Sequence, residues 1–137
     1  MNVTFIDDPS EKACKPIENG VLEYGLSEIN GDLPKKYAFH ACDSGKLIGG
    51  AVGRVHLSQC YLDNIWVSEA FRSKGVAKII HAEVVAYAEM CGCKKIQLNT
   101  LNKKAVKLYQ QLGYQELAVI KGYADGFDLH YMAKEII

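Results

Sequence analysis

The sequence lacks the features that mark several large classes of protein. It has no apolar run as long as a membrane span, and its first residues carry no basic segment followed by an apolar one, so we expect no membrane partner and no secretory signal. Sixteen acidic residues balance sixteen basic ones, which argues against a nucleic-acid partner. With 49% hydrophobic and 23% charged residues, the 137-residue chain is typical of one globular domain over residues 1–137.

Disulfides and metal sites are not expected either. An odd number of cysteines at irregular spacing makes a poor disulfide framework, and no second pair of ligands accompanies Cys91-Gly92-Cys93 at the spacing of a zinc site. We therefore expect free thiols, no metal cofactor and a cytoplasmic location. The five cysteines are Cys14, Cys42, Cys60, Cys91 and Cys93.

Arginine is also scarce, and the charge is distributed unevenly. Arg54 and Arg72 are the two arginines, beside fourteen lysines. Residues 1–34 have a net charge of −5, whereas residues 70–121 have a net charge of +6. The first segment would attract a cation and the second an anion.

Periodicity and turn residues predict alternating strands and helices. A strand at Val3–Ile6 precedes a helix that has Pro16 in its first turn and ends near Ile29, followed by a loop at residues 30–34. Three strands then form an antiparallel meander, with Gly49, Gly50 and Gly53 indicating a bulge or close packing: Tyr37–Cys42, Lys46–Leu57 and Cys60–Val67.

The second half of the chain changes to a β-α-β-α-β pattern. Its elements are helices at Val76–Cys91 and Lys103–Leu112, and strands at Lys95–Leu101, Tyr114–Ile120 and Asp128–Lys134. The fold class is therefore α/β, with a mixed sheet that changes from antiparallel to partly parallel. The apolar face of the helix at Val76–Cys91 includes Ile79 and Ile80, and we expect His81 to lie at the surface.

The start of the helix predicted from residue 76 has the features of an anion site. A helix N-terminus leaves backbone N–H groups unpaired and carries a partial positive charge. Gly75 and Ala77 remove side-chain bulk there, and three basic residues add positive charge: Arg72, Lys74 and Lys78. The spacing R-x-x-G-x-A fits neither the phosphate loop nor the dinucleotide-binding motif. A basic loop that ends in a glycine turn is the plainer alternative.

Two motifs resemble the GNAT superfamily of N-acetyltransferases. Arg72-Ser73-Lys74-Gly75-Val76-Ala77 matches its acetyl-CoA signature, Q/R-x-x-G-x-G/A, and Ile65–Glu69 looks like the strand and loop that lead into it. Asn102–Tyr114 resembles the N-x-x-A-x-x-L/F-Y-x-x-x-G-F/Y helix of the same family. The motifs stand in the family's order, and the resemblance is clear over about residues 46–120.

The resemblance implies a binding site for acetyl-CoA as co-substrate. The sheet would splay after Cys60–Val67, and the pantetheine arm would pair with main-chain groups of Ile65, Trp66 and Val67. Beside Arg72, the pyrophosphate would lie on the segment Ser73, Lys74, Gly75, Val76, Ala77 and Lys78. From the second motif, Asn102, Ala105 and Tyr109 would contact the cofactor, although Asn102 also suits a helix N-cap.

The resemblance also implies direct transfer of acetyl from a thioester to an amine. Tyr109 would protonate the departing thiolate, and a backbone N–H near Val67 would stabilise the oxyanion. Alternation along the strand would place four side chains on one face: Tyr61, Asp63, Ile65 and Val67. Asp63 is then a candidate general base, with Tyr61 or water as alternatives. Packing alone for Tyr109 and a structural hydrogen bond for Asp63 are the competing interpretations.

The acceptor amine is not defined by these motifs. In the family the acceptor groove is framed by the N-terminal helix and the loop before the last strand, here the acidic segment and Tyr123–Asp128. Carboxylates and aromatic rings there would suit a small cationic amine, or a lysine or N-terminal amine of a peptide. His130 would reach this groove or be a half-buried structural residue. The resemblance also allows a homodimer, with the last strand as the sheet edge that pairs.

Two functions of other classes stay open. One is a non-catalytic CoA-binding module of the same fold. The other is a small nucleotide-binding domain that uses the helix end at Gly75.

Overall fold

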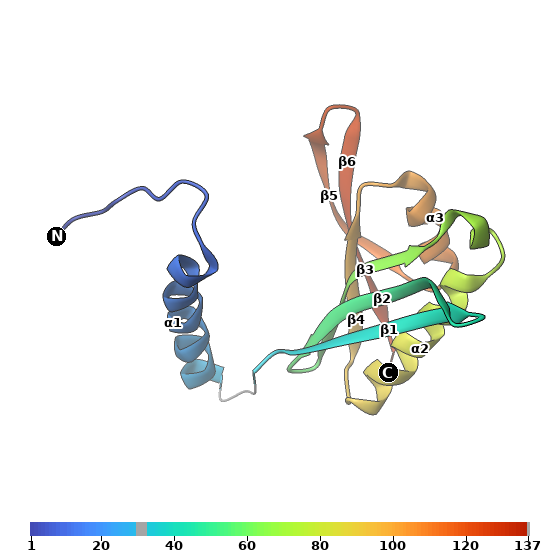
Figure 1. The fold of residues 1–137 in the computed structure, drawn as a ribbon, viewed down its shortest axis with the longest axis horizontal. Coiled ribbons are helices and arrows are strands. Elements are labelled where there is room, and N and C mark those ends of the chain that lie inside the picture. The colour runs from blue at the N-terminus through green and yellow to red at the C-terminus, as the bar shows by residue number, and fades with distance from the viewer. Residues whose placement is uncertain (30–32, 137) are drawn as a thin grey trace. The chain divides into compact units, whose positions relative to one another are not determined.

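The computed structural model describes residues 1–29 and 33–136 (Figure 1). Contacts within the chain divide it into two compact units, Met1–Leu33 and Pro34–Ile137, and each is considered by itself. Of the loop predicted at residues 30–34, residues 30–32 lie outside the described part.

The first unit contains one helix, α1 (Glu11–Ile29). The helix begins before the predicted start, because the Ser10 hydroxyl accepts a hydrogen bond from the N–H of Ala13 (3.2 Å) and caps it. Pro16 lies inside the helix, on an exposed stretch where water can satisfy the carbonyl that its missing N–H leaves free. The strand predicted at Val3–Ile6 is wrong: this segment is irregular and exposed, and α1 offers it no strand with which to pair.

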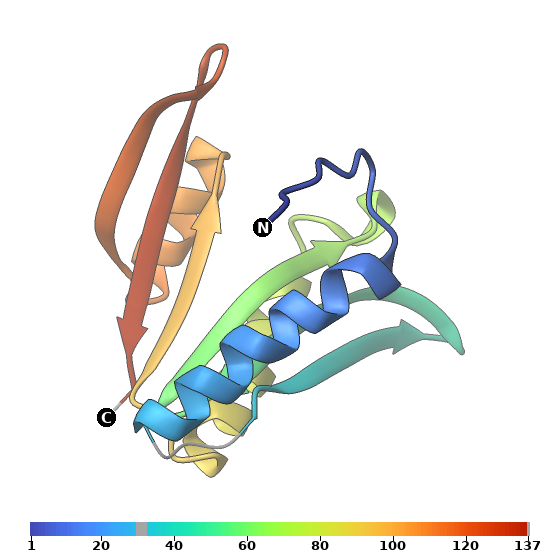
Figure 2. The same cartoon turned by 90° about the vertical axis from the view of Figure 1, so that its left-hand side faces the viewer.

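The second unit is a six-stranded sheet with two helices on one face (Figure 2). Its elements are β1 (Lys35–Asp43), β2 (Lys46–His56), β3 (Gln59–Val67), α2 (Val76–Met90), β4 (Lys95–Thr100), α3 (Lys103–Gln111), β5 (Gln115–Ala124) and β6 (Phe127–Glu135). The strand order is β1-β2-β3-β4-β6-β5. All neighbours are antiparallel except β3 and β4, so the predicted α/β fold with a mixed sheet is confirmed.

The last strand does not lie at a sheet edge. β5 and β6 form a hairpin, and β6 pairs with β4 on its other side, so the edges of the sheet are β1 and β5. The prediction of an edge at the last strand is therefore wrong. The chain returns from β5 into the centre of the sheet, an insertion that local sequence patterns do not reveal.

The predicted close packing along β2 is confirmed at Gly53. A Cβ atom at this position would collide with the main-chain oxygen of Tyr61 and with the ring of Tyr37. The register of β2 against β3 also shifts between Val52 and Gly53, but the extra residue lies on β3 and not on the glycine-rich strand where a bulge was expected.

Helix α2 covers the sheet with a face that includes Ile80 and Val84, both nearly inaccessible to solvent. This face is rotated from the prediction, since Ile79 is 66% exposed and His81 only 4%. The expected surface position of His81 is therefore wrong; a hydrogen bond to a buried tyrosine lets the ring enter the core. Other members of the core are Tyr37, Ala51, Cys60, Leu62, Cys93, Ile96, Leu98, Val106, Tyr109, Tyr114 and Met132.

Composition-based expectations can be checked at two points. The five cysteines are all free, as predicted; Cys93 is buried, whereas Cys91 is exposed just beyond the end of α2. Over residues 1–29 and 33–136, no helix has both the length and the apolar character needed to span a bilayer.

Candidate functional site

The sheet opens between β3 and β4, its parallel pair. These strands are paired only from Gln59 to Tyr61, opposite Lys95 to Gln97. The Gln97 amide donates a hydrogen bond to Gln59 Oε1 (2.7 Å) across this joint. Beyond Tyr61, β3 continues to Val67 with β2 as its partner, and in the described part of the chain no strand pairs with its other edge. This gap between the two strands is called the wedge.

A β-bulge at Asp63 lies where the wedge begins. Val52 is opposite Asn64 and Gly53 is opposite Leu62, so Asp63 is the extra residue of β3. A bulge of this kind bends the strand and increases its twist, which turns the rest of β3 away from β4.

The bulge determines on which face of the sheet each side chain of β3 lies. Ile65 and Val67 pack with Leu62 against the core under α2. Tyr61 and Asp63 lie on the opposite side, the outer face, defined as the face of the sheet away from α2. The prediction that all four alternate residues share one face is wrong, because an inserted residue reverses the alternation beyond it. Tyr61 and Asp63 nevertheless lie together.

On the helix side of the wedge, the start of α2 borders a pocket of about 380 Å³. Val67 at the end of β3, the loop before α2 and Leu108 of α3 complete its wall. The first helical hydrogen bond runs from the N–H of Ile79 to the carbonyl of Gly75 (3.2 Å). Among the described residues the N–H groups of Val76–Lys78 therefore have no backbone partner, so they can bind an anion.

The loop enters α2 through left-handed backbone at Ser73 (φ +61°) and Gly75 (φ +83°). A Cβ atom at Gly75 would meet no protein atom within 4 Å. Its place would be in open space beside the helix end, so a side chain there would strain the left-handed backbone but would meet a ligand and no other protein group. These residues fit a phosphate group that approaches the main chain closely.

The basic residues of this loop have different surroundings. Arg72 Nε donates a hydrogen bond to the main-chain oxygen of Val67 (2.9 Å), which ties the loop to the end of β3. The Lys74 ammonium lies 5.5 Å from the centroid of the Phe71 ring, and Lys78 borders the pocket. Both lysines are exposed and can supply positive charge to a bound anion.

Main-chain groups of β3 alternate between its two edges. The N–H of Ser68 donates to the carbonyl of Ile48 (2.7 Å), so Ser68 and, two residues earlier, Trp66 are turned toward β2. The N–H groups of Ile65 and Val67 are turned the other way, into the wedge. Of the three main-chain positions expected to meet the pantetheine arm, two thus face the wedge and Trp66 faces β2.

Tyr109 lies on α3 and is 7% exposed. Its ring meets that of Tyr114 edge to face, with the centroids 5.3 Å apart. Burial raises the pKa of Tyr109, so the phenol is protonated at neutral pH. The hydroxyl makes no hydrogen bond within the described residues, which leaves its proton available to a ligand.

Tyr114 links the two helices through His81 of α2. Its hydroxyl lies 2.8 Å from His81 Nε2 in the core. Burial raises the pKa of Tyr114, and it lowers the pKa of His81 with a smaller contribution from Lys134. The hydroxyl therefore donates to a neutral imidazole.

The other residues of the second motif have structural contacts. Asn102 Oδ1 accepts a hydrogen bond from the N–H of Lys104 (2.9 Å), so Asn102 caps α3, in agreement with the alternative stated for it. Ala105 is partly buried against the core. Asn102 also borders a surface hollow that Phe127 closes from the β5–β6 hairpin.

On the outer face, Arg54 joins Asp63 and Tyr61 into one cluster. Arg54 Nη1 donates to Asp63 Oδ1 (2.6 Å), and the guanidinium lies 4.3 Å from the Tyr61 ring centroid. The two charged side chains are 44% and 40% exposed. They border a pocket of about 320 Å³, called the outer pocket, whose other walls include Gln97, Asn99 and Tyr131.

Sequence reasoning missed these additional lining residues. Gln97 and Asn99 alternate with buried Ile96 and Leu98, so the polar face of β4 could have been identified from the sequence. Arg54 meets Asp63 only through the shifted register of β2 and β3, for which the sequence carries no clear signal.

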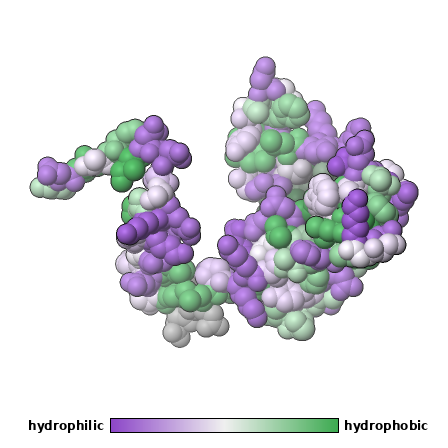
Figure 3. All heavy atoms as spheres, in the orientation of Figure 1, coloured by the Kyte–Doolittle hydropathy of each residue, from purple (hydrophilic) through white to green (hydrophobic). Residues whose placement is uncertain are grey.

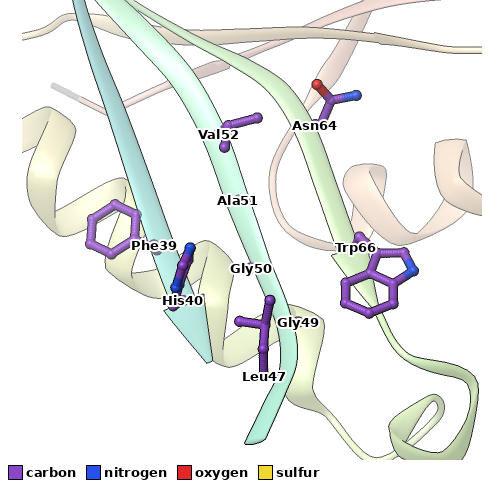
Figure 4. A pocket seen from close by; sticks show the side chains of 9 residues that line it. All are labelled: Phe39, His40, Leu47, Gly49, Gly50, Ala51, Val52, Asn64 and Trp66. Carbon is purple, nitrogen blue, oxygen red and sulfur yellow. The ribbon is translucent and has the colours of Figure 1, made fainter. Parts of the chain in front are cut away.

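An apolar hollow of about 190 Å³ continues along the outer face over β1, β2 and β3 (Figure 4). Val52 and Asn64 border the end of the hollow nearer Asp63, and Leu47 and Trp66 lie at its other end. Hydrophobic side chains are visible among polar ones on the surface of Pro34–Ile137 (Figure 3).

The predicted loop at Tyr123–Asp128 is the tip of the β5–β6 hairpin. The Asp128 carboxylate accepts a hydrogen bond from the N–H of Gly122 (2.9 Å), which lowers its pKa, and also contacts Lys121. His130 is largely buried, with Nδ1 3.4 Å from the Glu116 carboxylate, and alternation places it on the face opposite Tyr131.

The sequence matches one protein family and several known proteins. The profile of the acetyltransferase (GNAT) family matches residues 7–114. The chain is 35% identical over 102 residues to blasticidin-S acetyltransferase of Streptomyces morookaense, which covers 73% of this chain and 75% of that protein. It is 38% identical over 65 residues to thialysine N-epsilon-acetyltransferase of Mus musculus, covering 46% and 38% of the two chains.

Solved structures share the fold. A protein of Agrobacterium tumefaciens described as an acetyltransferase superimposes with a TM-score of 0.92 at 22% identity, over 98% of this chain and 99% of that one. A Bacillus anthracis protein described as a streptothricin acetyltransferase, in complex with acetyl coenzyme A, has a TM-score of 0.68 at 21% identity, over 76% and 64% of the two chains. At these identities the similarity concerns the fold alone.

Proposed function

The chain belongs to the acetyltransferase (GNAT) family, and on that basis we propose that it transfers the acetyl group of acetyl-CoA directly to a primary amine, as a single catalytic domain. One observation carries the proposal: the free edge of β3 and the unpaired N–H groups of α2 border the same pocket. Two relatives, named for acetylating blasticidin-S and the epsilon nitrogen of thialysine, support a small-molecule acceptor that reacts through an amine.

In this proposal the pocket at α2 binds the cofactor. The N–H groups of Val76–Lys78 hold the pyrophosphate, with Lys74 and Lys78 adding charge. Ser73 and Gly75 shape the approach, and Arg72 holds the loop against Val67. The cofactor supplies an acetyl thioester.

Main-chain groups of Ile65 and Val67 orient the pantetheine arm along the free edge of β3, much as an added strand would be held. Trp66 borders the path with its side chain on the outer face. Ala105 and Asn102 line the approach from α3, with Asn102 also serving as the helix cap.

The transfer forms one bond and breaks another. The amine nitrogen attacks the thioester carbon, a C–N bond forms, and the C–S bond breaks with both electrons going to sulfur. The N–H of Val67 stabilises the oxyanion, and Tyr109 donates its proton to the thiolate. Burial keeps Tyr109 protonated until it is needed.

Asp63 accepts the proton that the amine loses, directly or through water. One of its oxygens is held by Arg54, and the other makes no hydrogen bond within the described residues. Tyr61 lies beside it and is the alternative base. Both border the outer pocket, so the acceptor would enter from the face opposite α2.

Release of CoA thiol from acetyl-CoA, followed over a broad amine panel, tests the proposal. Acetyl-CoA should bind and ATP or NAD should not. A protein that binds acetyl-CoA but acetylates no amine would be the non-catalytic CoA-binding module, and one that binds ATP or NAD instead would be a nucleotide-binding domain.

The two ends of α2 offer a matched pair of variants for the cofactor site. Gly75→Glu places a carboxylate where phosphate would bind, and we expect acetyl-CoA affinity to fall about 100-fold by blocked approach and charge repulsion. Gly92→Glu adds the same side chain at a left-handed glycine (φ +75°) that also has free space, but beyond the other end of the helix. Calorimetry that finds equal affinity for both variants would contradict the cofactor site.

A further inference from the structure

The outer pocket contains one full charge of each sign. Arg54 reaches it from β2 and Asp63 from the bulge of β3, and the two are hydrogen-bonded through one nitrogen and one oxygen. Around them the pocket is polar but uncharged, since its other polar side chains are Tyr61, Gln97, Asn99 and Tyr131.

From this pair we infer that the acceptor is itself zwitterionic, an α- or β-amino acid whose reacting amine lies next to a carboxylate. The inference rests on the proposed function and narrows its substrate class. The ammonium group would approach the free oxygen of Asp63, and the substrate carboxylate would bind the free N–H groups of Arg54.

The geometry of the pair limits the separation of the two substrate groups. Within residues 1–29 and 33–136, Nη1 is the one nitrogen of Arg54 that makes a hydrogen bond, so the rest of its planar fork can bind a carboxylate in the bidentate manner that guanidinium favours. Because Arg54 and Asp63 touch, the free ends of the pair are only a few ångströms apart. An amine and a carboxylate on the same carbon or on adjacent carbons match this spacing, whereas the two ends of a long diamine do not.

The charges around the pocket disfavour a purely cationic acceptor. Lys36 of β1 occupies the register position beside Arg54, so two exposed cations flank each other next to the single carboxylate. A polyamine would be attracted by one group, Asp63, and repelled by two, Arg54 and Lys36. An amino acid would gain an attraction to each member of the pair.

The apolar hollow along β1–β3 suggests the character of the rest of the acceptor. It begins at Val52 and Asn64, the neighbours of Arg54 and Asp63 along their strands, and ends at Leu47 and Trp66 (Figure 4). A side chain that extends from the charged head into this hollow would therefore be apolar.

Matched substrates test the inference. Phenylalanine and phenethylamine, leucine and isoamylamine, and tryptophan and tryptamine differ only in the carboxylate. Rates of CoA release, expressed as kcat/KM per free amine, should favour the amino acid of at least one pair by roughly 10- to 100-fold, the size expected for a charge-assisted hydrogen bond. The amino acid carboxamides should behave like the amines.

Arg54→Gln should remove this preference, and Arg54→Lys should restore part of it. Lys36→Gln removes a positive charge from the neighbouring strand outside the pocket and should retain the preference. Calorimetric binding of the same amino acids and carboxamides to the CoA-loaded protein gives a readout that does not depend on turnover.

Several outcomes would overturn the inference. Equal or better use of the carboxylate-free amine by the wild-type protein would do so, and so would an Arg54→Gln variant that loses both substrates in the same proportion. In either case CoA release with other amines would leave the proposed function standing. If acetyl-CoA binds but no amine of any class releases CoA, and no amino acid binds more tightly than its carboxamide, both the acetyltransferase proposal and this inference fail.

Discussion

The two sides of the wedge are built from opposite kinds of chemistry. On the helix side, Tyr109, Tyr114 and His81 are buried, neutral and in contact through rings and one hydrogen bond. On the outer face, Arg54 and Asp63 are charged, and both are partly open to water. In the proposed mechanism this difference assigns the two tasks to different environments: the buried side would hold a proton for the leaving group, and the exposed side would receive a charged acceptor.

Strand β3 serves both sides because of the bulge at Asp63. Without an extra residue, Tyr61 and Ile65 would face the same way; with it, Tyr61 faces the outer pocket and Ile65 the core. One inserted residue therefore separates the proposed acceptor side from the proposed cofactor side within a single strand.

We expect the largest effect on turnover from a substitution of Tyr109, on the buried side of the wedge. Tyr109→Phe keeps the ring and its packing against Tyr114 but removes the transferable proton, so kcat should fall about 10²–10⁴-fold with acetyl-CoA affinity preserved. Pre-steady-state rates with a saturating amine measure the chemical step. Tyr87→Phe is the matched control, because Tyr87 packs against Tyr37 and Phe39 and not against Tyr109, and it should have normal turnover. A Tyr109→Phe enzyme as fast as this control would make Tyr109 a packing residue.

On the outer face, Asp63→Asn is expected to have the next largest effect. Asparagine can still accept the hydrogen bond of Arg54 but cannot take a proton from the amine, so turnover should fall about 100-fold at mildly acidic pH and less at alkaline pH, where free amine is abundant. This effect is measured from the pH dependence of kcat/KM for Asp63→Asn, recorded beside that of Tyr61→Phe. If the Asp63→Asn profile keeps the wild-type shape and Tyr61→Phe does not, the base is Tyr61.

On the buried side, the hydrogen bond between His81 and Tyr114 should also contribute to the free energy of unfolding. Tyr114→Phe leaves His81 without its partner in the core and should cost about 1–3 kcal/mol of unfolding free energy, measured by denaturant titration. The double variant with His81→Leu should recover part of this loss, since an apolar pair leaves no unsatisfied group. A Tyr114→Phe protein as stable as wild type would show that the hydrogen bond is energetically unimportant.

The same pair predicts how stability depends on pH. Burial lowers the pKa of His81 in the folded protein, so as pH falls below the unfolded value of about 6.5 the unfolded chain binds a proton that the folded chain excludes. This contribution to stability is complete above that value and is lost as pH falls toward the folded pKa. His81→Leu should therefore flatten the stability profile below about pH 6.5, the pKa of the unfolded chain.

The order of elements from β1 onward was predictable, because each has its own periodicity and is bounded by turn residues such as Gly45 and Gly113. The helix end at Gly75 was predictable for the same reason, since a glycine, flanking cations and a helix start form a local pattern. Features that depend on distant residues were not. The burial of His81 on α2 depends on its hydrogen bond to Tyr114. The side of the sheet on which each β3 side chain lies depends on the bulge against β2. The interior position of β6 depends on the return of the chain from β5.

The short joint between β3 and β4 has a consequence for the order in which the sheet assembles. β1, β2 and β3 follow one another along the chain as hairpins, and β5 with β6 is another, so these pieces need only short loops to close. The parallel joint spans Gln59–Tyr61 against Lys95–Gln97 and requires the whole α2 crossover to be in place first. Because contacts between residues far apart in the sequence cost more loop-closure entropy, we expect the wedge, and with it both pockets, to be completed only when the two hairpin modules dock.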